Sequence, residues 1–347
     1  MRISVVKKDQ RQSFDIEDGE RILYAGLRQG LSLPHECATG TCGSCKAVLS
    51  SGEIRRLWDQ APGAKSCKPA KNEFLMCQSA ALGDCEISFR GKLEPVDRSE
   101  YHPDYFDGKI FGSTLLTQDV MQFWVRFDQP LPFQPGQFVV VNVPGLDGGR
   151  AYSMVNHNRD SRELEFVIKR LPGGGFSEWM FDGTGNDASV RVFGSLGLAT
   201  LGQDERRDLI CITGGSGIAG IVSMLGRAVD DGYFEHNSGH LFFGVRTWQD
   251  LFFHNRLLEL NEKTSGKLKI TFAFSDAEVP HDEVKITPDI HYLHGFVTPL
   301  AMQQIAEKYN DQIVFLAGPP LMVDSAIRQL VLEVGCPVDA IRYDKFG

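Results

Sequence analysis

Four cysteines near the amino end carry the first chemistry in the chain. Cys37, Cys42 and Cys45 lie within the segment CATGTCGSC, and Cys77 follows inside FLMCQ. The spacing C-x4-C-x2-C with a distant fourth cysteine is typical of a plant-type 2Fe-2S cluster, which four thiolates bind. Two glycines inside the segment allow the loop to curl, so that backbone N–H groups point at the sulfurs. We therefore expect these four cysteines to ligate a 2Fe-2S cluster.

Two alternatives stay open at the level of sequence. Zinc is one, although zinc loops favour two C-x2-4-C pairs and Cys77 has no nearby partner of that kind. The identity of the fourth ligand is the other, because Cys67 and Cys85 also follow the loop. Cys77 is preferred for its apolar flank FLM, whereas Cys67 lies in the polar turn KSCKPAK. The remaining cysteines are interpreted as small buried or idle thiols: Cys67, Cys85, Cys211 and Cys336.

A second pair of segments carries the groups that a flavin dinucleotide needs. These are a cation for the pyrophosphate, an aromatic face against the ring, a hydroxyl near the ring N5 atom, and unpaired amides at a helix start. Arg150, Tyr152 and Ser153 of RAYS provide the first three, and the turn 173–177 (GGGFS) provides the amides. Each segment alone is more often structural. Their order, after a cysteine loop and before a parallel sheet, predicts an FAD site.

The segment 214–220, Gly-Gly-Ser-Gly-Ile-Ala-Gly, carries the third motif. Gly215, Gly217 and Gly220 satisfy G-x-G-x-x-G, a weak pattern by itself. The expected strand DLICIT precedes it and the helical stretch IVSMLGRAV follows, so bare amides and the helix dipole would face a pyrophosphate. The alternative is a packing turn of an ordinary α/β domain. Together with the other motifs, the segment predicts a site for a nicotinamide dinucleotide.

Two features near the carboxyl end point to the same sheet edge. VFLAG is an expected strand that leads into Gly318-Pro319-Pro320, where ligands collect in open α/β folds. Phe346, next to the last residue, is usually explained as part of a frayed end. Its functional interpretation is a movable aromatic lid over the flavin.

The elements that must position these groups predict three domains, because 347 residues are too many for one ordinary core. Residues 1–92 combine short strands with one short helix, 21–29, which suits a small α+β unit, and 93–107 form a polar linker. Residues 108–203 contain short alternating strands between Pro/Gly turns, typical of an antiparallel β-barrel. Residues 204–347 contain apolar strands separated by helical stretches, typical of a parallel α/β sheet.

Composition argues against several classes of protein. The net charge of −9 disfavours nonspecific binding of nucleic acid or of anionic membranes. No apolar stretch approaches the roughly 20 residues of a membrane span, and no secretion signal is recognised, so we expect a soluble, cytoplasmic protein. Residues 1–92 carry 14 Lys and Arg against 11 Asp and Glu, so this N-terminal segment is mildly basic and the rest of the chain is acidic.

Taken in order, CATGTCGSC…FLMCQ, PGQF, RAYSMVN, GGGFS, TGGSGIAG and AGPPLMV resemble the ferredoxin–NADP reductase family. The similarity is greatest to reductase components of bacterial multicomponent oxygenases with an N-terminal plant-type ferredoxin domain, of the toluene monooxygenase reductase kind. It covers nearly the whole chain and implies a β-grasp ferredoxin domain, an antiparallel β-barrel FAD domain and a parallel-sheet α/β domain that binds NAD(P).

Three positions depart from the family pattern. Ala317 stands where the family often has Cys, which bears on the geometry or rate of hydride transfer. Gly220 stands where many members have Pro. The segment 194–197, Gly-Ser-Leu-Gly, replaces the usual Gly-Pro-aromatic-Gly.

The resemblance also implies a set of site residues. Arg150, Tyr152 and Ser153 would contact FAD, with Gly174 and Ser177 at its pyrophosphate. Gly214, Gly215 and Gly217 would contact the nicotinamide nucleotide, and Phe346 would stack near the flavin, so that Ser153 and Phe346 are the catalytic candidates. The remaining cofactor contacts would be Ala151, Lys169, Gly175, Phe176, Ser216, Arg246, Gly318 and Pro319.

The implied activity is electron transfer from NADH through FAD and the 2Fe-2S cluster to an oxygenase hydroxylase component or a Rieske-type ferredoxin, for hydroxylation of an organic, aromatic compound. Flavin belongs in the middle because a nicotinamide donates two electrons as hydride, whereas a 2Fe-2S cluster accepts one. The mildly basic segment 1–92 predicts an electron acceptor with an acidic patch, whose docking to this segment would depend on salt concentration. Two rivals are a reductase that supplies a pyridoxamine-dependent sugar dehydrase, and a non-catalytic metal-binding or sensor protein.

The choice of nucleotide depends on Arg246, which follows the expected strand HLFFGV. Its guanidinium would suit the 2′-phosphate of NADPH. Similar reductases that use NADH also carry an arginine in this region, and we expect NADH.

Overall fold

The computed structural model describes residues 1–7, 10–93, 102–143, 145–146, 148–158, 160–279, 287–306 and 308–345. Its contacts divide the chain into two compact units. The first comprises Met1–Gly108, Val139–Ala151 and Ser189–Leu196, and the second comprises Lys109–Phe138, Tyr152–Ala188 and Gly197–Gly347. Most of the expected linker lies outside the described residues, and the three-domain boundaries stay a prediction.

The first unit contains a small mixed sheet with strand order β2-β1-β7-β3-β5. β1 pairs with β2 antiparallel and with β7 parallel, and β3 pairs with β5 and β7 antiparallel. Helix α1 (Ile22–Arg28) buries six of its seven residues, as the expected helix 21–29 requires. The strands are β1 (Arg2–Lys7), β2 (Gln10–Asp15), β3 (Lys46–Ser51), β5 (Glu73–Leu75) and β7 (Cys85–Phe89), with a separate pair, β4 (Ile54–Arg56) and β6 (Ser79–Ala81).

The middle of the chain forms the antiparallel, curled sheet that the alternating pattern predicted. In the second unit the order is β8-β9-β12, and β9 pairs with β12 in an antiparallel register that sets Phe123 opposite Phe166. In the first unit β10 lies next to β13. The elements of this segment are β8 (Asp104–Leu115), β9 (Val120–Pro132), β10 (Phe138–Asn142), β11 (Arg150–Ser153), β12 (Asp160–Lys169), α2 (Gly175–Phe181) and β13 (Ser189–Leu196).

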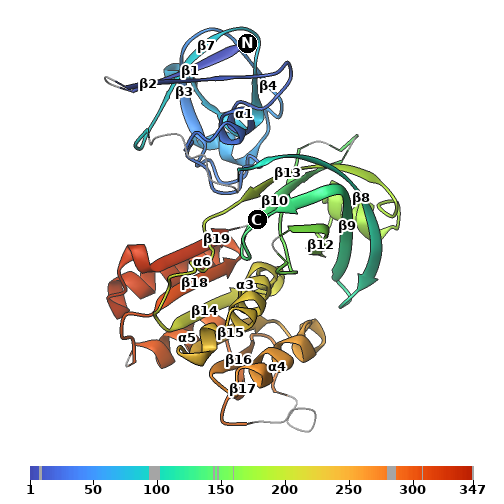
Figure 1. Cartoon of the computed structure of the whole chain (residues 1–347), viewed down its shortest axis with the longest axis vertical. Coiled ribbons are helices and arrows are strands. Elements are labelled where there is room, and N and C mark those ends of the chain that lie inside the picture. Colours follow the sequence, from blue (N-terminus) through green and yellow to red (C-terminus); the bar gives the residue numbers. More distant parts are fainter. Residues whose placement is uncertain are drawn as a thin grey trace. The chain divides into compact units, whose positions relative to one another are not determined.

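The last segment is a parallel sheet with strand order β17-β16-β15-β14-β18-β19, labelled in Figure 1. The chain order reverses between β14 and β18, and a ligand-binding crevice is expected outside the carboxyl ends of strands at such a point. The strands are β14 (Leu209–Gly214), β15 (Gly239–Val245), β16 (Leu268–Phe274), β17 (Ile290–His294), β18 (Ile313–Gly318) and β19 (Ile341–Lys345).

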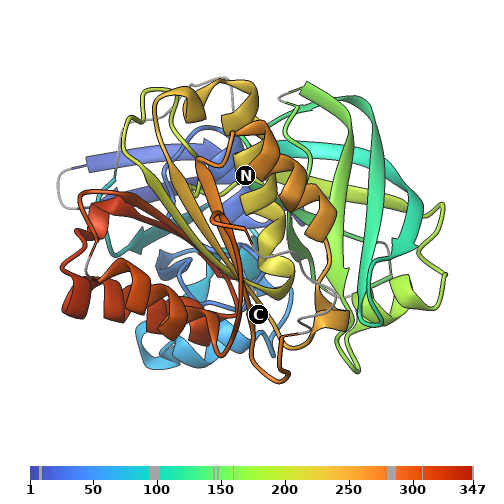
Figure 2. The same cartoon turned by 90° about the horizontal axis from the view of Figure 1, so that it is seen from below.

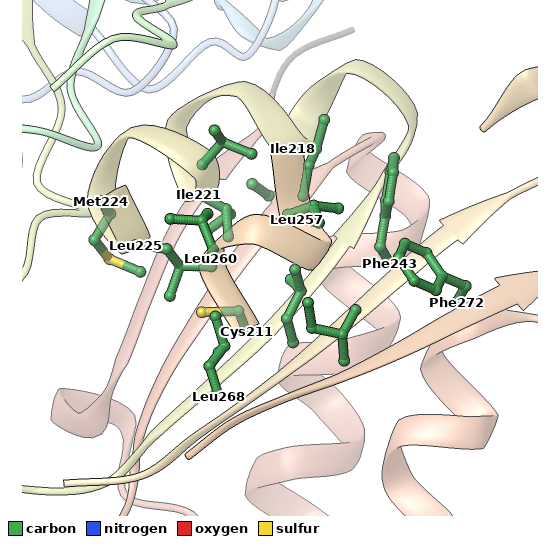
Figure 3. Close-up of a cluster of buried hydrophobic side chains, with 14 of the residues drawn as sticks. Cys211, Ile218, Ile221, Met224, Leu225, Phe243, Leu257, Leu260, Leu268 and Phe272 are labelled. Carbon is green, nitrogen blue, oxygen red and sulfur yellow. The ribbon is translucent and has the colours of Figure 1, made fainter. Parts of the chain in front are cut away.

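Helices cover both faces of this sheet, as Figure 2 shows. Because side chains alternate along a strand, Cys211 of β14 packs in the cluster of α3 and α4, whereas Ile212 packs in that of α5 and α6. Figure 3 shows Ile221 of α3 and Leu257 of α4 in the first cluster, above Cys211. The helices are α3 (Ile218–Asp230), α4 (His254–Lys263), α5 (Val297–Ile305) and α6 (Pro320–Gln329).

Short helical turns connect these elements. They are η1 (Pro62–Ser66), η2 (Pro69–Lys71), η3 (Met76–Gln78), η4 (Gly215–Gly217), η5 (Tyr233–Glu235), η6 (Trp248–Asp250), η7 (Leu330–Val334) and η8 (Val338–Ala340). In the described part of the chain, no helix combines the length and the apolar character that crossing a membrane requires.

Candidate functional site

The cysteine loop lies in the first unit, and its sulfurs form two pairs. Cys37 Sγ and Cys42 Sγ are 3.1 Å apart, and Cys45 Sγ and Cys77 Sγ are also 3.1 Å apart. Gln78, next to Cys77, donates from Nε2 to Thr39 O in the loop of Cys37 at 2.9 Å, so the two pairs belong to one site. Cys42 is exposed and the other three are buried, so one edge of the site meets solvent.

Backbone amides of the loop point at these sulfurs. The N–H groups of Thr39 and Cys42 donate to Cys37 Sγ at 3.4 Å, and that of Ser44 donates to Cys42 Sγ at 3.5 Å. The hydrogen bond from the Cys42 thiol lowers the pKa of Cys37 to about 4, although burial opposes this shift. The lowered pKa favours the thiolate of Cys37, which is the form that binds metal.

Two glycines allow the loop its tight path. Gly40 and Gly43 have φ values of +93° and +80°, which side chains other than glycine rarely adopt. A Cβ on Gly43 would lie 2.8 Å from Ser66 Oγ, and one on Gly40 would lie 2.7 Å from Gln78 Cγ. Both positions therefore lack room for a side chain.

Two buried side chains hold the loop in place. Tyr24 on α1 donates to Ala38 O at 2.9 Å, and Gln78 Nε2 donates to Thr39 O at 2.9 Å. The Tyr24 ring also stacks on Phe193 of β13, with centroids 4.0 Å apart and planes at 5°. Tyr24 therefore joins the cysteine loop to a strand of the barrel segment inside the first unit.

The pairing of the sulfurs bears on the choice between zinc and an iron–sulfur cluster. A single zinc ion requires its four ligands around one point. Among the residues that the structure describes, no three His, Cys, Asp or Glu side chains converge in that way. Two adjacent pairs instead match the donor set of a two-iron cluster, in which each iron takes two thiolates. The donor set thus fits a 2Fe-2S cluster better than zinc.

In the second unit, the Tyr152 ring lies in an aromatic group of the barrel segment. Its centroid is 5.4 Å from that of Phe176 on α2 and 5.9 Å from that of Phe123 on β9. Phe176 in turn lies 5.6 Å from Trp179. The structure thus brings together one residue from each of the two segments in which the sequence predicted flavin contacts.

Ser153 lies beside the start of α3. A Cβ added to Gly220 would lie 3.3 Å from Ser153 Cβ, 3.4 Å from Ser153 Oγ and 3.3 Å from Gly136 O. Any side chain at position 220 would therefore press on Ser153. The departure from proline at this position leaves space next to the Ser153 hydroxyl.

Arg150 and Ser177 already have protein partners. Arg150 Nη1 donates to Gly149 O at 3.0 Å, and its guanidinium lies over the Trp58 ring, 5.9 Å from the centroid. The buried Ser177 Oγ accepts from Leu171 N at 3.0 Å and so closes the glycine turn. Their contacts with the FAD pyrophosphate stay predictions.

A cavity of about 560 Å³ opens at the carboxyl edge of the parallel sheet, within the range of small-molecule sites. The cavity lies at the point where strand order reverses, which is where ligands bind in open α/β sheets. Several residues that the sequence predicted to contact the nucleotide line this cavity. Residues that follow several different strands line it, among them Gly214, Gly215, Gly244, Ser275, Val297 and Pro319.

Gly217 marks the closest backbone approach near this cavity. A Cβ there would lie 2.6 Å from Ala317 O and 2.7 Å from Gly318 Cα, both in β18. Gly215 instead has a φ of +54° and open space around it. The middle glycine of G-x-G-x-x-G is therefore required by packing and the first by backbone conformation.

Arg246 and Lys169 line the same cavity, and both are ion-paired. Arg246 Nη2 lies 3.1 Å from Asp119 Oδ2 and 3.1 Å from Asp250 Oδ1, and Lys169 Nζ lies 3.3 Å from Asp119 Oδ2. Sequence reasoning selected both cations and missed both carboxylates. Asp250 had a signal, because it is four residues after Arg246 and ends the capping-box pattern Thr-x-x-Asp at Thr247. Asp119, 127 residues from Arg246, had no local signal.

The structure places the other predicted residues on or next to named elements, and their contacts with a cofactor stay predictions. Ala151 is on β11, Gly174 and Gly175 begin α2, Ser216 is in η4, and Gly318 ends β18. Phe346 lies outside the described residues, and its role as a lid stays a prediction.

Three family models match consecutive parts of the chain. A 2Fe-2S iron–sulfur cluster binding domain matches residues 5–82. An oxidoreductase FAD-binding domain matches residues 107–200, and an oxidoreductase NAD-binding domain matches residues 211–328.

Several relatives match nearly the whole length of the chain. The ferredoxin–NAD(+) reductase component of an alkene monooxygenase system from Xanthobacter autotrophicus is 30% identical over 340 residues, which cover 96% of this chain and 98% of that one. A ferredoxin–NAD(P)(+) reductase of Metapseudomonas resinovorans is 31% identical over 335 residues, 94% and 95% of the two chains. The solved structure titled ferredoxin reductase in carbazole 1,9a-dioxygenase is 28% identical, with a TM-score of 0.81 over 100% of this chain and 99% of that one.

Fold, cavity and sulfur site together define an iron–sulfur flavoprotein of the oxidoreductase class, one that works with FAD, a 2Fe-2S cluster and NADH. The chain belongs to the ferredoxin–NAD(P)+ reductase family, in the branch with an N-terminal 2Fe-2S domain. The resemblance in its motifs is thereby confirmed, and it is an electron-transfer reductase.

Proposed function

We propose that this reductase takes electrons from NADH and delivers them singly to the oxygenase of a multicomponent system, or to the ferredoxin of that oxygenase. The observation that carries the proposal is the sulfur site, with two thiol pairs and one exposed member, Cys42. An exposed ligand provides a short exit from a buried site to a second protein. The relatives, named as components of alkene monooxygenase and carbazole dioxygenase systems, support an acceptor of this kind.

The proposed ligands of each group follow from the site. Cys37, Cys42, Cys45 and Cys77 would hold the cluster. FAD would be held by residues of the two barrel segments, Arg150, Ala151, Tyr152, Ser153, Gly174, Gly175, Phe176 and Ser177. The nicotinamide nucleotide would meet Gly214, Gly215, Ser216, Gly217, Lys169, Arg246, Gly318 and Pro319. When bound, FAD couples a two-electron donor to the one-electron cluster.

The residues of the chain supply position and charge. The amides of Thr39 and Cys42 stabilise thiolate at Cys37, and Tyr24 keeps their loop in place. Ser153 Oγ can donate a hydrogen bond beside the start of α3, in the space that Gly220 leaves. At Gly217, the absence of a Cβ brings the α3 amides close to β18. We place the reaction in the cytoplasm, where NADH is supplied.

The acceptor that we propose presents an acidic surface. Turn η1 packs on the cysteine loop, since Gly63 N donates to Gly40 O at 2.9 Å. Between residues 53 and 71, which include η1, the exposed cations are Arg55, Arg56, Lys65, Lys68 and Lys71, against two exposed acids, Glu53 and Asp59. A positive surface beside the electron exit favours a negatively charged partner, and the association would weaken as salt rises.

An anaerobic titration with NADH tests the electron path. We expect flavin and iron–sulfur absorption bands to bleach, with a total uptake of about three electrons per chain, two at the flavin and one at the cluster. Protein purified without oxygen that contains neither iron nor acid-labile sulfide would overturn the proposal.

A salt series tests the docking. We expect added NaCl to slow reduction of the oxygenase or ferredoxin acceptor and to leave ferricyanide reduction unchanged. Equal salt dependence for both acceptors would remove the acidic partner from the proposal.

A further inference from the structure

Four charged side chains meet at one edge of the nucleotide cavity: Asp119, Lys169, Arg246 and Asp250. Arg246 Nη2 is shared between two carboxylates, at 3.1 Å from Asp119 and 3.1 Å from Asp250. Asp119 Oδ2 in turn lies 3.3 Å from Lys169 Nζ. The two cations that line the cavity at this edge, Lys169 and Arg246, are therefore already paired with carboxylates.

Both carboxylates are held where they are. Asp250 Oδ2 accepts from Thr247 N at 3.0 Å and from Thr247 Oγ1 at 2.9 Å, which caps η6. Asp119 Oδ1 accepts from Thr117 Oγ1 at 3.2 Å. The side chains of Asp119 and Asp250 are 25% and 22% exposed, so solvent screens them less than a surface pair. Their charge is a fixed part of the cavity wall.

The place of this group in the fold matters for nucleotide choice. Arg246 follows β15, the strand that comes after the glycine turn and α3 in the chain. In nucleotide-binding sheets, this region contacts the adenosine ribose, where a carboxylate accepts from the 2′-hydroxyl or an arginine accommodates the 2′-phosphate. Ser275, after the next strand, also lines the cavity, and its hydroxyl donates to Asp276 at 2.6 Å, so a third carboxylate is near.

We propose that Asp119 and Asp250 make this enzyme select NADH over NADPH by engaging Arg246. A 2′-phosphate carries close to two negative charges at neutral pH. At this edge it would meet two fixed carboxylates, and the two lining cations that the structure describes, Lys169 and Arg246, are already ion-paired. A 2′-hydroxyl can instead donate to one of the carboxylates. The inference rests on the proposed function, because it assumes that the nucleotide is oxidised at this cavity.

The test is a substitution that keeps the shape of the side chain and removes its charge. In the FAD- and cluster-loaded protein with Asp119→Asn, we expect the ratio of kcat/KM for NADPH to that for NADH to rise about tenfold. We expect binding of 2′,5′-ADP, measured by calorimetry, to tighten by a similar factor relative to 5′-AMP. Asp250→Asn serves as the second variant and should shift both ratios in the same direction.

Two further variants make the test specific. Asp231→Asn is the matched control, because Asp231 also pairs with an arginine, Arg227, at 2.6 Å, and it does not line the cavity. It should move neither ratio. In Asp250→Asn/Arg246→Gln, the gain in 2′,5′-ADP affinity should disappear, because Arg246 is the cation that Asp250 engages and no released guanidinium would be present. A gain that persists without Arg246 would overturn the engagement of Arg246 as the cause.

The inference fails if both single variants fold, reduce their flavin with NADH, and keep both nucleotide ratios unchanged, or if the unsubstituted enzyme prefers NADPH. Failure of the proposed function would look different. In that case neither nucleotide would reduce the flavin, and 5′-AMP would not bind.

Discussion

Replacing the middle glycine of the nucleotide turn by alanine separates a packing requirement from a conformational one. The Cβ of Gly217→Ala would lie 2.6 Å from Ala317 O and 2.7 Å from Ala317 C. Both atoms belong to the backbone of β18, which cannot rotate away as a side chain can. We expect a loss of about 1–3 kcal/mol in unfolding free energy, the usual cost of overpacking.

The two other glycines of the motif serve as internal standards. Gly215→Ala meets no atom within 4 Å and is strained by its φ of +54°, which costs about 1–2 kcal/mol. Gly220→Ala meets Ser153 Cβ at 3.3 Å, and the helix propensity of alanine, up to about 1 kcal/mol over glycine, offsets that contact. The expected order of destabilisation places Gly217 first, Gly215 second and Gly220 last.

Hydrogen–deuterium exchange of peptides from β14 and β18 measures this loss locally, which suits a chain with more than one compact unit. Calorimetric titration with 5′-AMP reports the nucleotide site in parallel. Gly217→Ala should speed exchange in both strands and weaken 5′-AMP binding. A stability of Gly217→Ala within about 0.5 kcal/mol of that of Gly220→Ala would refute the packing argument, since such a difference is typical of neutral surface substitutions.

Three other predictions concern the sulfur site and the core. Cys77→Ser should lose iron and sulfide on chemical assay while its FAD content stays constant. Cys67→Ser is the control and should keep its iron. Loss of iron from both variants would contradict the choice of Cys77 as the fourth ligand. Arg256→Met should destabilise the fold by about 3–5 kcal/mol at pH 8, because the buried Glu165 carboxylate loses its positively charged partner and keeps the hydrogen bond from Gln122. Burial raises the pKa of Glu165, so its charged form lowers the stability of the fold as pH rises through that pKa, whereas the neutral form below pH 4.5 does not. Thermal melts should therefore show a smaller loss of stability for Arg256→Met at pH 5 than at pH 8. An equal loss at the two pH values would contradict this reasoning. Tyr24→Phe should remove one hydrogen bond to the cysteine loop, worth about 0.5–1.5 kcal/mol, and speed bleaching of the cluster by a chelator; an unchanged rate would show that the bond does not protect the site.

The sequence by itself determined the features that depend on local spacing. The cysteine spacing predicted the sulfur site, and the glycine turn between DLICIT and a helix predicted the end of β14 and the start of α3. Apolar runs predicted β14, β15, β16 and β18, because a strand buried on both faces needs few polar positions. These patterns work because backbone geometry repeats over a few residues.

The tertiary structure decided which distant groups meet. Asp119 reaches Arg246 across 127 positions, and Tyr24 stacks on Phe193 through folding alone. Such contacts depend on the path of the chain between the residues, and no local pattern encodes that path. The sequence therefore predicted that the Arg246 guanidinium would suit a 2′-phosphate, and the fold revealed that two carboxylates, Asp119 and Asp250, engage this guanidinium.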